Sequence, residues 1–354
     1  MPDVTSEQVL EALRGVSDPD RGEDIVSLEM VQGLSVDGAK VSFSIEVDPA
    51  RGPELEGLRK EAEEAAKSVP GVSLVAAILT AERQAPPPPT EQAASFNKLQ
   101  LPTIKSVIAV ASGKGGVGKS TTAVNLALAM ASGGKRVGII DADIYGPSIP
   151  RMLGVTDQPV ESDNGKITPL TGHGIECISM GFMVDEGTPV IWRGPMATGA
   201  LEQLFADVEW GELDALVVDM PPGTGDIHLT LSQRVPISGV VIVSTPQDIA
   251  LVDARKGLNM FRKVEVPVYG IIENMSYFLC PDNGKRYYIF GQDGGKREAE
   301  AMGVDFLGEV PLDTHIRETS DLGQPLVATE PDSEHAQTYK AIAAKVWEKI
   351  AAGG

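Results

Sequence analysis

The chain has 354 residues, of which 42% are hydrophobic and 23% charged, a composition that predicts a folded protein with one sizeable domain and a smaller one. Its formal charge of −20 opposes the counterion release that drives nonspecific DNA binding, and no Lys/Arg cluster reverses this charge locally, so we expect no nucleic-acid partner. No stretch approaches the roughly 20 apolar residues that cross a bilayer, and residues 1–7 lack signal-peptide features, so we expect no membrane association and a cytoplasmic location.

The first 81 residues predict a small acidic α+β domain. The pattern indicates a helix over Ser6 to Arg14, alternating strands over Gly33 to Val47, a helix over Glu54 to Ser68 and a strand over Val72 to Leu79. Residues 1–80 hold 16 acidic and 7 basic side chains, a local charge of −9. The surface of this domain is therefore expected to repel anions.

A proline-rich segment separates this domain from the rest of the chain. Pro86 to Pro89 are four consecutive prolines within a polar, alanine-rich tract, which favours an extended, semi-rigid spacer. We therefore predict a linker over residues 82–104 and a second domain over residues 105–354.

The second domain alternates apolar strands with helices, which is typical of an α/β fold with a doubly wound, mostly parallel sheet. The predicted strands are Val107 to Ala111, Val137 to Asp141, Ile175 to Ser179, Ala215 to Asp219, Gly239 to Ser244, Val268 to Glu273 and Phe306 to Val310. Ligands of such sheets bind at the carboxyl ends of the strands, so we expect the site there.

The first of these strands leads into a phosphate-binding loop. The loop has the pattern G-x-x-x-x-G-K-[ST], and the helix formers from Thr122 to Ala131 follow it. Small residues let backbone N–H groups close around phosphate oxygens, while Lys119 reaches the terminal phosphates and Ser120 ligates Mg²⁺. The predicted nucleotide-binding residues are Gly113, Lys114, Gly115, Gly116, Val117, Gly118, Lys119, Ser120 and Thr121. The pattern predicts a nucleoside triphosphate.

Polar residues follow three other strands. Asp141 ends one strand and Asp143 lies just beyond it, while Asp219 ends another and opens a Pro- and Gly-rich turn up to Asp226. An Asp after an apolar strand presents a ligand to Mg²⁺ in P-loop enzymes, and the turn suits a segment that responds to the γ-phosphate. The alternative interpretation is capping of strand ends and turns. Asn274 follows a third strand.

The cysteines, the histidines and the C-terminus offer weaker patterns. Two cysteines are too few for a disulfide framework, and Cys177 lies in an apolar strand where we expect a buried structural thiol. The four histidines lack ligand spacing, so we expect packing or surface roles and no zinc site. Apolar residues from Tyr339 to Ile350 recur at helical spacing, which fits a membrane-binding helix or a helix that packs on the sheet, and we expect the second.

Lys114 is a second lysine that ordinary phosphate loops do not require, and several further motifs accompany it. They are Asp141 to Ser148, Trp192 to Pro195, Asp219 to Asp226, Thr245 to Gln247 and Glu273 to Ser276. In these motifs the chain resembles the Mrp (ApbC-like) iron–sulfur cluster carriers of the Mrp/MinD group of deviant P-loop ATPases. The resemblance covers nearly the whole chain, since the first 80 residues look like a small domain related to iron–sulfur assembly factors.

The resemblance implies a slow ATPase that acts as a homodimer with ATP between two subunits. Lys114 would stabilise the partner subunit's nucleotide in trans, and Asp143 would position the attacking water. Asp141 and Asp219 would belong to the Mg²⁺ shell, and Asn274 would contact adenine. The implied ligands are ATP, Mg²⁺ and an iron–sulfur cluster of the 4Fe-4S type. The implied partners are apo iron–sulfur proteins or assembly factors.

The chain departs from this family at the cluster site. Carriers of this type usually show C-x-x-C after the Glu-Asn-Met-Ser segment, whereas this chain reads Cys280-Pro281-Asp282-Asn283. A 4Fe-4S cluster normally takes four thiolates, and two Cys280 side chains supply half of them. The missing ligands are open between Asp282, an external thiol and the recipient protein; otherwise the cluster function is lost or weakened.

Three hypotheses follow from these patterns. The first is an ATP-hydrolysing cluster carrier that uses Cys280 at the dimer interface. The second is a spatial-organising ATPase of the MinD/ParA kind, which requires a lipid or DNA surface that the charge does not favour. The third is an ATP-dependent dimeric switch or scaffold without a cluster, for which the replacement of the second cysteine by Asn283 argues.

Overall fold

The computed structural model describes residues 4–19, 21–28, 30–37, 40–47, 55–72, 74–81, 98–144, 146–162, 164–182 and 194–353. Its contacts divide the chain into two compact units, residues 1–94 and 95–354. Residues 82–97 of the predicted linker, and Trp192 and Arg193 of the predicted motifs, lie outside the described residues.

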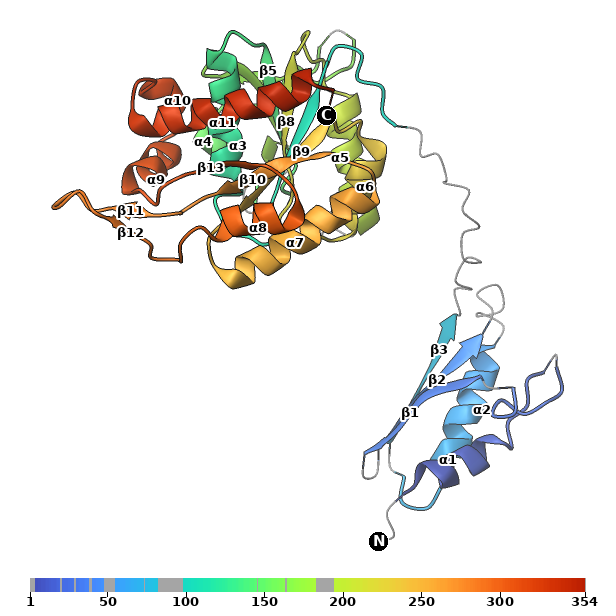
Figure 1. The fold of residues 1–354 in the computed structure, drawn as a ribbon. Coiled ribbons are helices and arrows are strands. Elements are labelled where there is room, and N and C mark those ends of the chain that lie inside the picture. The colour runs from blue at the N-terminus through green and yellow to red at the C-terminus, as the bar shows by residue number, and fades with distance from the viewer. Residues whose placement is uncertain are drawn as a thin grey trace. The chain divides into compact units, whose positions relative to one another are not determined.

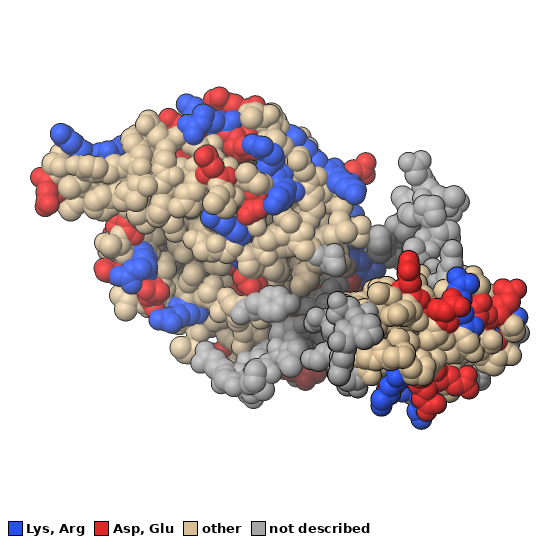
Figure 2. Space-filling model, turned by 90° about the horizontal axis from the view of Figure 1, so that it is seen from below, with Lys and Arg blue, Asp and Glu red and all other residues tan. Residues whose placement is uncertain are grey.

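The smaller unit is a three-stranded sheet covered by two helices. The strands β1 (Val31–Asp37), β2 (Lys40–Val47) and β3 (Leu74–Ala81) lie in this order, with β1 antiparallel and β3 parallel to β2. Helix α1 (Ser6–Leu13) begins at a capping box, in which Thr5 and Gln8 exchange side-chain and backbone hydrogen bonds, and α2 (Glu56–Lys67) joins β2 to β3. Carboxylates are prominent on the face of this unit that Figure 2 shows.

The larger unit contains an eight-stranded sheet. Its strands lie in the order β13-β10-β9-β4-β8-β5-β7-β6, all parallel except the edge strand β6, which is antiparallel to β7. In chain order they are β4 (Val107–Ala111), β5 (Val137–Asp141), β6 (Leu170–Gly172), β7 (Ile175–Ser179), β8 (Ala215–Asp219), β9 (Gly239–Ser244), β10 (Val268–Glu273) and β13 (Phe306–Glu309). The central strands are continuous apolar runs because helices bury both of their faces.

Helices cover the sheet on both sides (Figure 1), and each side has its own hydrophobic core. One layer holds α3 (Lys119–Ser132), α4 (Ile149–Met152), α9 (Thr314–Asp321), α10 (Leu326–Thr329) and α11 (Glu334–Ala351). The other holds α5 (Gly194–Ala206), α6 (Asp226–Arg234), α7 (Asp248–Lys263) and α8 (Gly294–Met302). A 3₁₀ turn, η1 (Met180–Phe182), follows β7. This is the doubly wound arrangement predicted from the sequence.

All seven predicted strands of the larger unit are present, and three short strands were missed. The missed elements are β6 and the two strands of a hairpin, β11 (Phe278–Leu279) and β12 (Arg286–Tyr287). Strands of two or three residues are too short to show a periodicity, and their pairing is a tertiary property. The packing of the C-terminal helix is confirmed, because Tyr339, Ile342 and Val346 of α11 are buried in the core with α3.

Candidate functional site

The phosphate loop runs from the end of β4 into α3 and packs tightly against two neighbouring elements. A Cβ atom on Gly113 would lie 2.2 Å from the carbonyl carbon of Asp253 in α7, and one on Gly118 would lie 2.1 Å from Nδ2 of Asn274. Gly116 and Gly118 also have φ angles of +80°, a region that L side chains rarely adopt. Only glycine therefore fits at these positions. The contacts with Asp253 and Asn274 fix the loop conformation together with the loop's own sequence.

Asn274, which follows β10, is one of the contacts that hold the loop. Its side-chain amide donates a hydrogen bond to the carbonyl oxygen of Val117 at 2.8 Å, and its backbone N–H donates to Ser244 at the end of β9. The structure thus places Asn274 beneath the loop, with its amide group engaged there. Its contact with adenine stays a prediction.

Lys119 and two carboxylates form a buried cluster at the first turn of α3. The Lys119 ammonium lies 2.6 Å from Oδ1 of Asp219 and 3.8 Å from Oδ2 of Asp143, and it is 3.3 Å from the Ser120 hydroxyl. Asp219 is fully buried at the end of β8, and Lys119 is nearly so. Residues from three separate segments are therefore brought together at the carboxyl ends of β4, β5 and β8, where an open α/β sheet binds its ligand.

Each carboxylate of this cluster retains one oxygen without a partner. Oδ1 of Asp143 and Oδ2 of Asp219 are buried, and no donor reaches either atom within the part of the chain that the structure describes. Burial raises the pKa of Asp219, while the adjacent Lys119 lowers it. Buried acceptors that lack donors are costly, so this donor set fits the water ligands of a Mg²⁺ ion held by Ser120.

Asp141 has a different environment from its two neighbours. Its oxygens accept hydrogen bonds from the backbone N–H groups of Asp143, Ser148 and Ile149 and from the hydroxyl of Ser179. Burial, with the nearby Asp219 charge, raises the pKa of Asp141 to about 7. Asp141 therefore organises the segment that follows β5, and its place in the Mg²⁺ shell stays a prediction.

A cavity of about 220 Å³ opens above the loop and is the space available to phosphates. Its lining residues include Lys114, Lys119, Ser120, Asp143, Ser148 and Pro222. Lys114 is half-buried at the edge of this cavity, and within the described ranges it has no carboxylate partner. A cation without a partner at a phosphate site is available for a second nucleotide or for a second molecule of the chain.

His228 is a residue whose position the sequence did not reveal. It lies in the first turn of α6, only 2% exposed, and its ring hydrogen-bonds the carbonyl of Pro221 in the turn after Asp219. Burial, with a smaller contribution from the Lys119 charge, lowers the pKa of His228 to about 4, although the hydrogen bond to Pro221 acts in the opposite direction. The ring is therefore neutral at pH 7, and it supports the Pro- and Gly-rich turn from behind. The sequence feature that could have predicted this position is a histidine at the third residue of the helix that follows the Gly-rich turn.

Cys280 lies on the β11–β12 hairpin, which projects from the larger unit (Figure 1). The thiol is partly exposed, and Leu279, Tyr287 and Ile289 expose much of their apolar surface beside it. The side chain of Asn283 accepts a hydrogen bond from the Lys285 backbone N–H at 2.9 Å and donates to the Tyr287 hydroxyl. Asn283 therefore stabilises the turn of the hairpin, so the position of the expected second cysteine has a structural role here.

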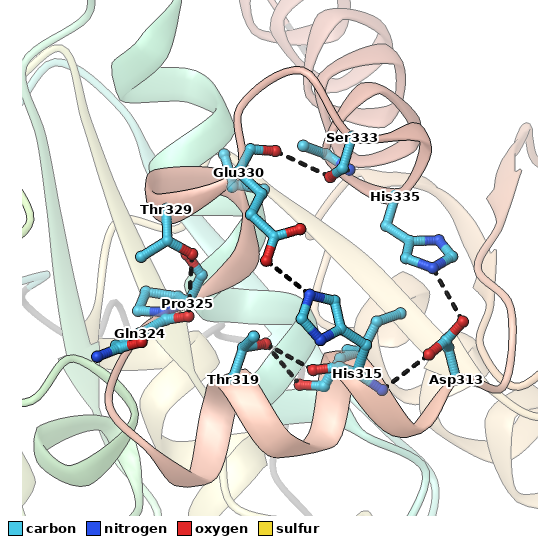
Figure 3. Close-up of polar contacts among 12 residues, drawn as sticks. Asp313, His315, Thr319, Gln324, Pro325, Thr329, Glu330, Ser333 and His335 are labelled. Atoms are coloured by element: carbon cyan, nitrogen blue, oxygen red, sulfur yellow. Dashed lines mark hydrogen bonds and ion pairs between the residues drawn. The ribbon is translucent and has the colours of Figure 1, made fainter.

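The other cysteine and the histidines match their predicted roles in part. Cys177 is buried in β7, and burial raises its pKa to about 12, as expected of a structural thiol. His315 and His335 are paired with Glu330 and Asp313 at 2.6 Å and 3.0 Å around α9 and the start of α11 (Figure 3). No three His, Cys, Asp or Glu side chains converge as a metal-binding group within the ranges described above. None of the helices described there is long and apolar enough to cross a membrane.

Known proteins resemble both units. A family described as "NUBPL iron-transfer P-loop NTPase" matches residues 103–347, and one described as "Iron-sulfur cluster assembly protein" matches residues 6–77. An "Iron-sulfur cluster carrier protein" of Synechocystis sp. is 44% identical over 352 residues, 98% of each chain. The mouse "Iron-sulfur cluster transfer protein NUBPL" is 55% identical over 249 residues, 70% of this chain and 78% of the relative.

A solved structure supports the same assignment. The nucleotide-binding protein of Archaeoglobus fulgidus in complex with ADP is 38% identical, with a TM-score of 0.57 over 66% of this chain and 90% of that one. The cell-division ATPase MinD of Pyrococcus furiosus, at 21% identity and a TM-score of 0.53 over 69% and 99%, shares the fold. The chain belongs to the family of NUBPL iron-transfer P-loop NTPases.

Proposed function

We propose that this chain is an ATP-hydrolysing carrier that holds an iron–sulfur cluster and passes it to apoproteins, and that it works as a homodimer. The observation that carries the ATPase part is the buried cluster of Lys119, Asp143 and Asp219 beside the phosphate cavity. The carrier part is supported by the partly exposed thiol of Cys280 on a projecting hairpin and by similarity to iron–sulfur cluster carrier proteins of Synechocystis and Deinococcus radiodurans, which align with 98% and 96% of this chain.

Hydrolysis follows from what these residues can do when ATP enters. The Lys119 ammonium exchanges its ion pair with Asp219 for the terminal phosphates, which neutralises charge that develops on them. Ser120 would hold Mg²⁺, which would supply a Lewis acid for the phosphate charge. The buried oxygen of Asp219 that lacks a donor would accept hydrogen bonds from water on the ion. Asp143, whose free oxygen faces no donor, orients the attacking water.

The dimer is supported by the surface next to the phosphate loop. Helix α7 contacts the loop at Gly113, and its first turns expose Ile249 and Val252 by 74% and 48%. Exposed aliphatic side chains beside a polar site are typical of a protein–protein contact. A second copy that covers them would bring its own Lys114 to this nucleotide, so that each lysine acts in trans like an arginine finger.

A complementation experiment tests this dimer. Lys114→Ala and Lys119→Ala should each abolish most turnover, but a 1:1 mixture should recover about a quarter of wild-type activity, because mixed dimers contain one complete site. Phosphate release is the measurement, and Lys263→Ala, an exposed lysine on α7, is the control. A mixture no more active than its components would contradict the action of Lys114 in trans.

The cluster is treated as cargo, because a single subunit offers one thiolate. Two Cys280 residues in a dimer would supply two iron ligands, and the remaining positions would be filled by an external thiol or by the recipient. An incomplete ligand set favours transfer of the cluster over its storage. Ligands of the recipient protein can bind the open iron positions before the Cys280 thiolates leave. The 4Fe-4S type expected from the resemblance is part of this proposal.

Anaerobic reconstitution tests the cargo directly. The wild-type protein should bind iron and sulfide with charge-transfer absorption in the visible range, and Cys280→Ala should lose this absorption while it keeps ATP binding. Cys177→Ala is the matched control, because that thiol is buried in β7. Equal iron content in wild type and Cys280→Ala would exclude Cys280 as a ligand.

Asn283 favours a second function, in which the chain is an ATP-dependent dimeric scaffold without a cluster. Its side chain is already used for the hairpin turn, and the second thiol is missing. The same reconstitution distinguishes the two functions, since a scaffold would hydrolyse ATP and bind no iron in either variant. The cytoplasmic location stays a prediction.

A further inference from the structure

A groove lies at the end of α3 that is farthest from the nucleotide. Figure 1 shows α11 running across α3, and where the two helices separate they enclose a cavity of about 400 Å³ that is open to solvent. Small and apolar residues line it: Ala129, Met130, Gly133, Ala343, Ala344 and Trp347. The small side chains create the space, and the Trp347 indole provides an apolar wall beside it.

Two lysines stand over this apolar surface without counterions. The ammonium of Lys135 lies 4.6 Å from the centre of the Trp347 ring, and that of Lys340 donates to the carbonyl oxygen of Pro331 at 2.7 Å. Neither lysine has a carboxylate within ion-pair distance among the residues whose placement is described, and no acidic residue lines the groove.

We propose that this groove binds a segment of an acidic polypeptide, with an apolar side chain placed against Trp347 and carboxylates placed at Lys135 and Lys340. Charge complementarity carries the choice of partner: a carboxylate here gains two charge-assisted contacts, whereas a basic segment would meet both lysines. The apolar wall requires a hydrophobic side chain next to the acidic ones. The occupant is therefore a peptide in which acidic and apolar residues alternate.

The groove is independent of the nucleotide chemistry. Helix α3 begins at Lys119 in the phosphate site and ends at Ser132 beside the groove, a separation of roughly 20 Å along the helix. A peptide in the groove therefore does not compete with ATP for space. Substitutions in the groove should leave ATP hydrolysis unchanged, which separates this proposal from the proposed carrier function.

Fluorescence anisotropy with the full-length protein provides the test. The probe is a labelled peptide of alternating Glu and Leu, compared with the same peptide in which Gln replaces Glu and with one in which Lys replaces Glu. The acidic peptide should bind, more weakly as salt rises, and the other two should bind at least roughly tenfold more weakly. Equal binding of the three peptides, or no binding of the acidic one, would overturn the proposal.

Variants locate the binding. Lys135→Glu combined with Lys340→Glu should weaken the acidic peptide at least roughly tenfold, and so should Ala344→Trp, which fills the groove without a change of charge. The exposed lysines Lys263 of α7 and Lys296 of α8 provide the matched control, as Lys263→Glu combined with Lys296→Glu, which should bind as wild type does. Unchanged ATP hydrolysis and thermal unfolding show that each variant is folded. Affinity that none of the groove variants alters would place the peptide elsewhere and overturn the proposal.

Two competitors distinguish other occupants. Phenylacetate carries the same chemistry as a free small molecule, and anionic phospholipid vesicles carry it on a membrane surface. The proposal predicts that neither displaces the peptide at concentrations near the peptide's own Kd. Displacement by phenylacetate at such concentrations would assign the groove to a small aromatic acid instead, and displacement by vesicles would assign it to a lipid headgroup.

Discussion

The phosphate site and the Cys280 hairpin are built in opposite ways. Lys119, Asp143 and Asp219 are buried, come from three segments and are held at the ends of central strands. One chain therefore supplies all three of these groups. Cys280 directly follows the two-residue strand β11 in a hairpin with exposed side chains, and one chain supplies a single thiol there. Buried geometry suits chemistry that must be preorganised, whereas an exposed single thiol suits the proposed cargo, which must leave.

The largest effect on ATP turnover is expected from a substitution of Lys119 in the buried phosphate site. Lys119→Ala should lower ATP turnover by at least roughly a thousandfold, because it removes the charge that stabilises the transferring phosphoryl group. It also leaves Asp219 buried without its partner, which should cost roughly 3 kcal/mol of unfolding free energy. Phosphate release and urea unfolding measure the two effects, and Cys280→Ala should change neither. Normal turnover in Lys119→Ala would contradict the assignment of the phosphate site to this loop.

Asp143→Asn is expected to have the next largest effect on turnover. The amide keeps the size of the side chain but loses the charge that orients water, so turnover should fall by roughly a hundredfold while ATP affinity changes little. Single-turnover hydrolysis and binding of a nonhydrolysable ATP analogue separate these steps. A variant that loses binding and turnover equally would show that Asp143 holds the nucleotide and does not act on the water.

His228 makes the stability of the larger unit depend on pH. Its folded pKa of about 4 lies below the ordinary 6.5, so the unfolded chain binds a proton between these values and the folded chain does not. Stability from this group is complete above pH 6.5 and is lost as pH falls towards 4, by on the order of 3 kcal/mol. Urea unfolding followed by tryptophan fluorescence should show this loss in wild type and in His315→Gln. It should be absent in His228→Gln, which does not titrate; the same loss in that variant would assign it to another group.

The smallest effect is expected on the exposed side. Asn283→Cys adds a second thiolate to each hairpin, so iron retained after anaerobic reconstitution and gel filtration should rise about twofold, although the turn loses the hydrogen bonds of Asn283. Transfer of the cluster to an acceptor protein should become slower, because fewer ligand positions are free. Asn283→Ser, which replaces the same amide without adding a thiol, is the control. Unchanged iron retention in Asn283→Cys would show that the hairpin does not bind the cluster.

Strong local sequence patterns predicted much of this fold. The seven long strands of the larger unit and the phosphate loop were predicted from apolar runs and from a motif whose glycines and lysine have direct chemical reasons. The short strands β6, β11 and β12 were missed, because pairing between neighbours defines them and their own sequence does not. The predicted roles of Asp141 and Asn274 stay predictions, since in the structure both side chains are engaged in holding loops.

The sequence by itself determined the nucleotide loop and the order of the long strands, and through its resemblance to a family the departure at Asn283, because these are local patterns or single residues. The tertiary structure alone decided which carboxylate oxygens remain without partners, that His228 lies buried behind the turn at Pro221, and that Lys135, in the connection after α3, lies over the Trp347 ring of α11. Burial and unpaired atoms arise from contacts between segments far apart in the chain. They therefore depend on packing, which periodicity and spacing do not specify.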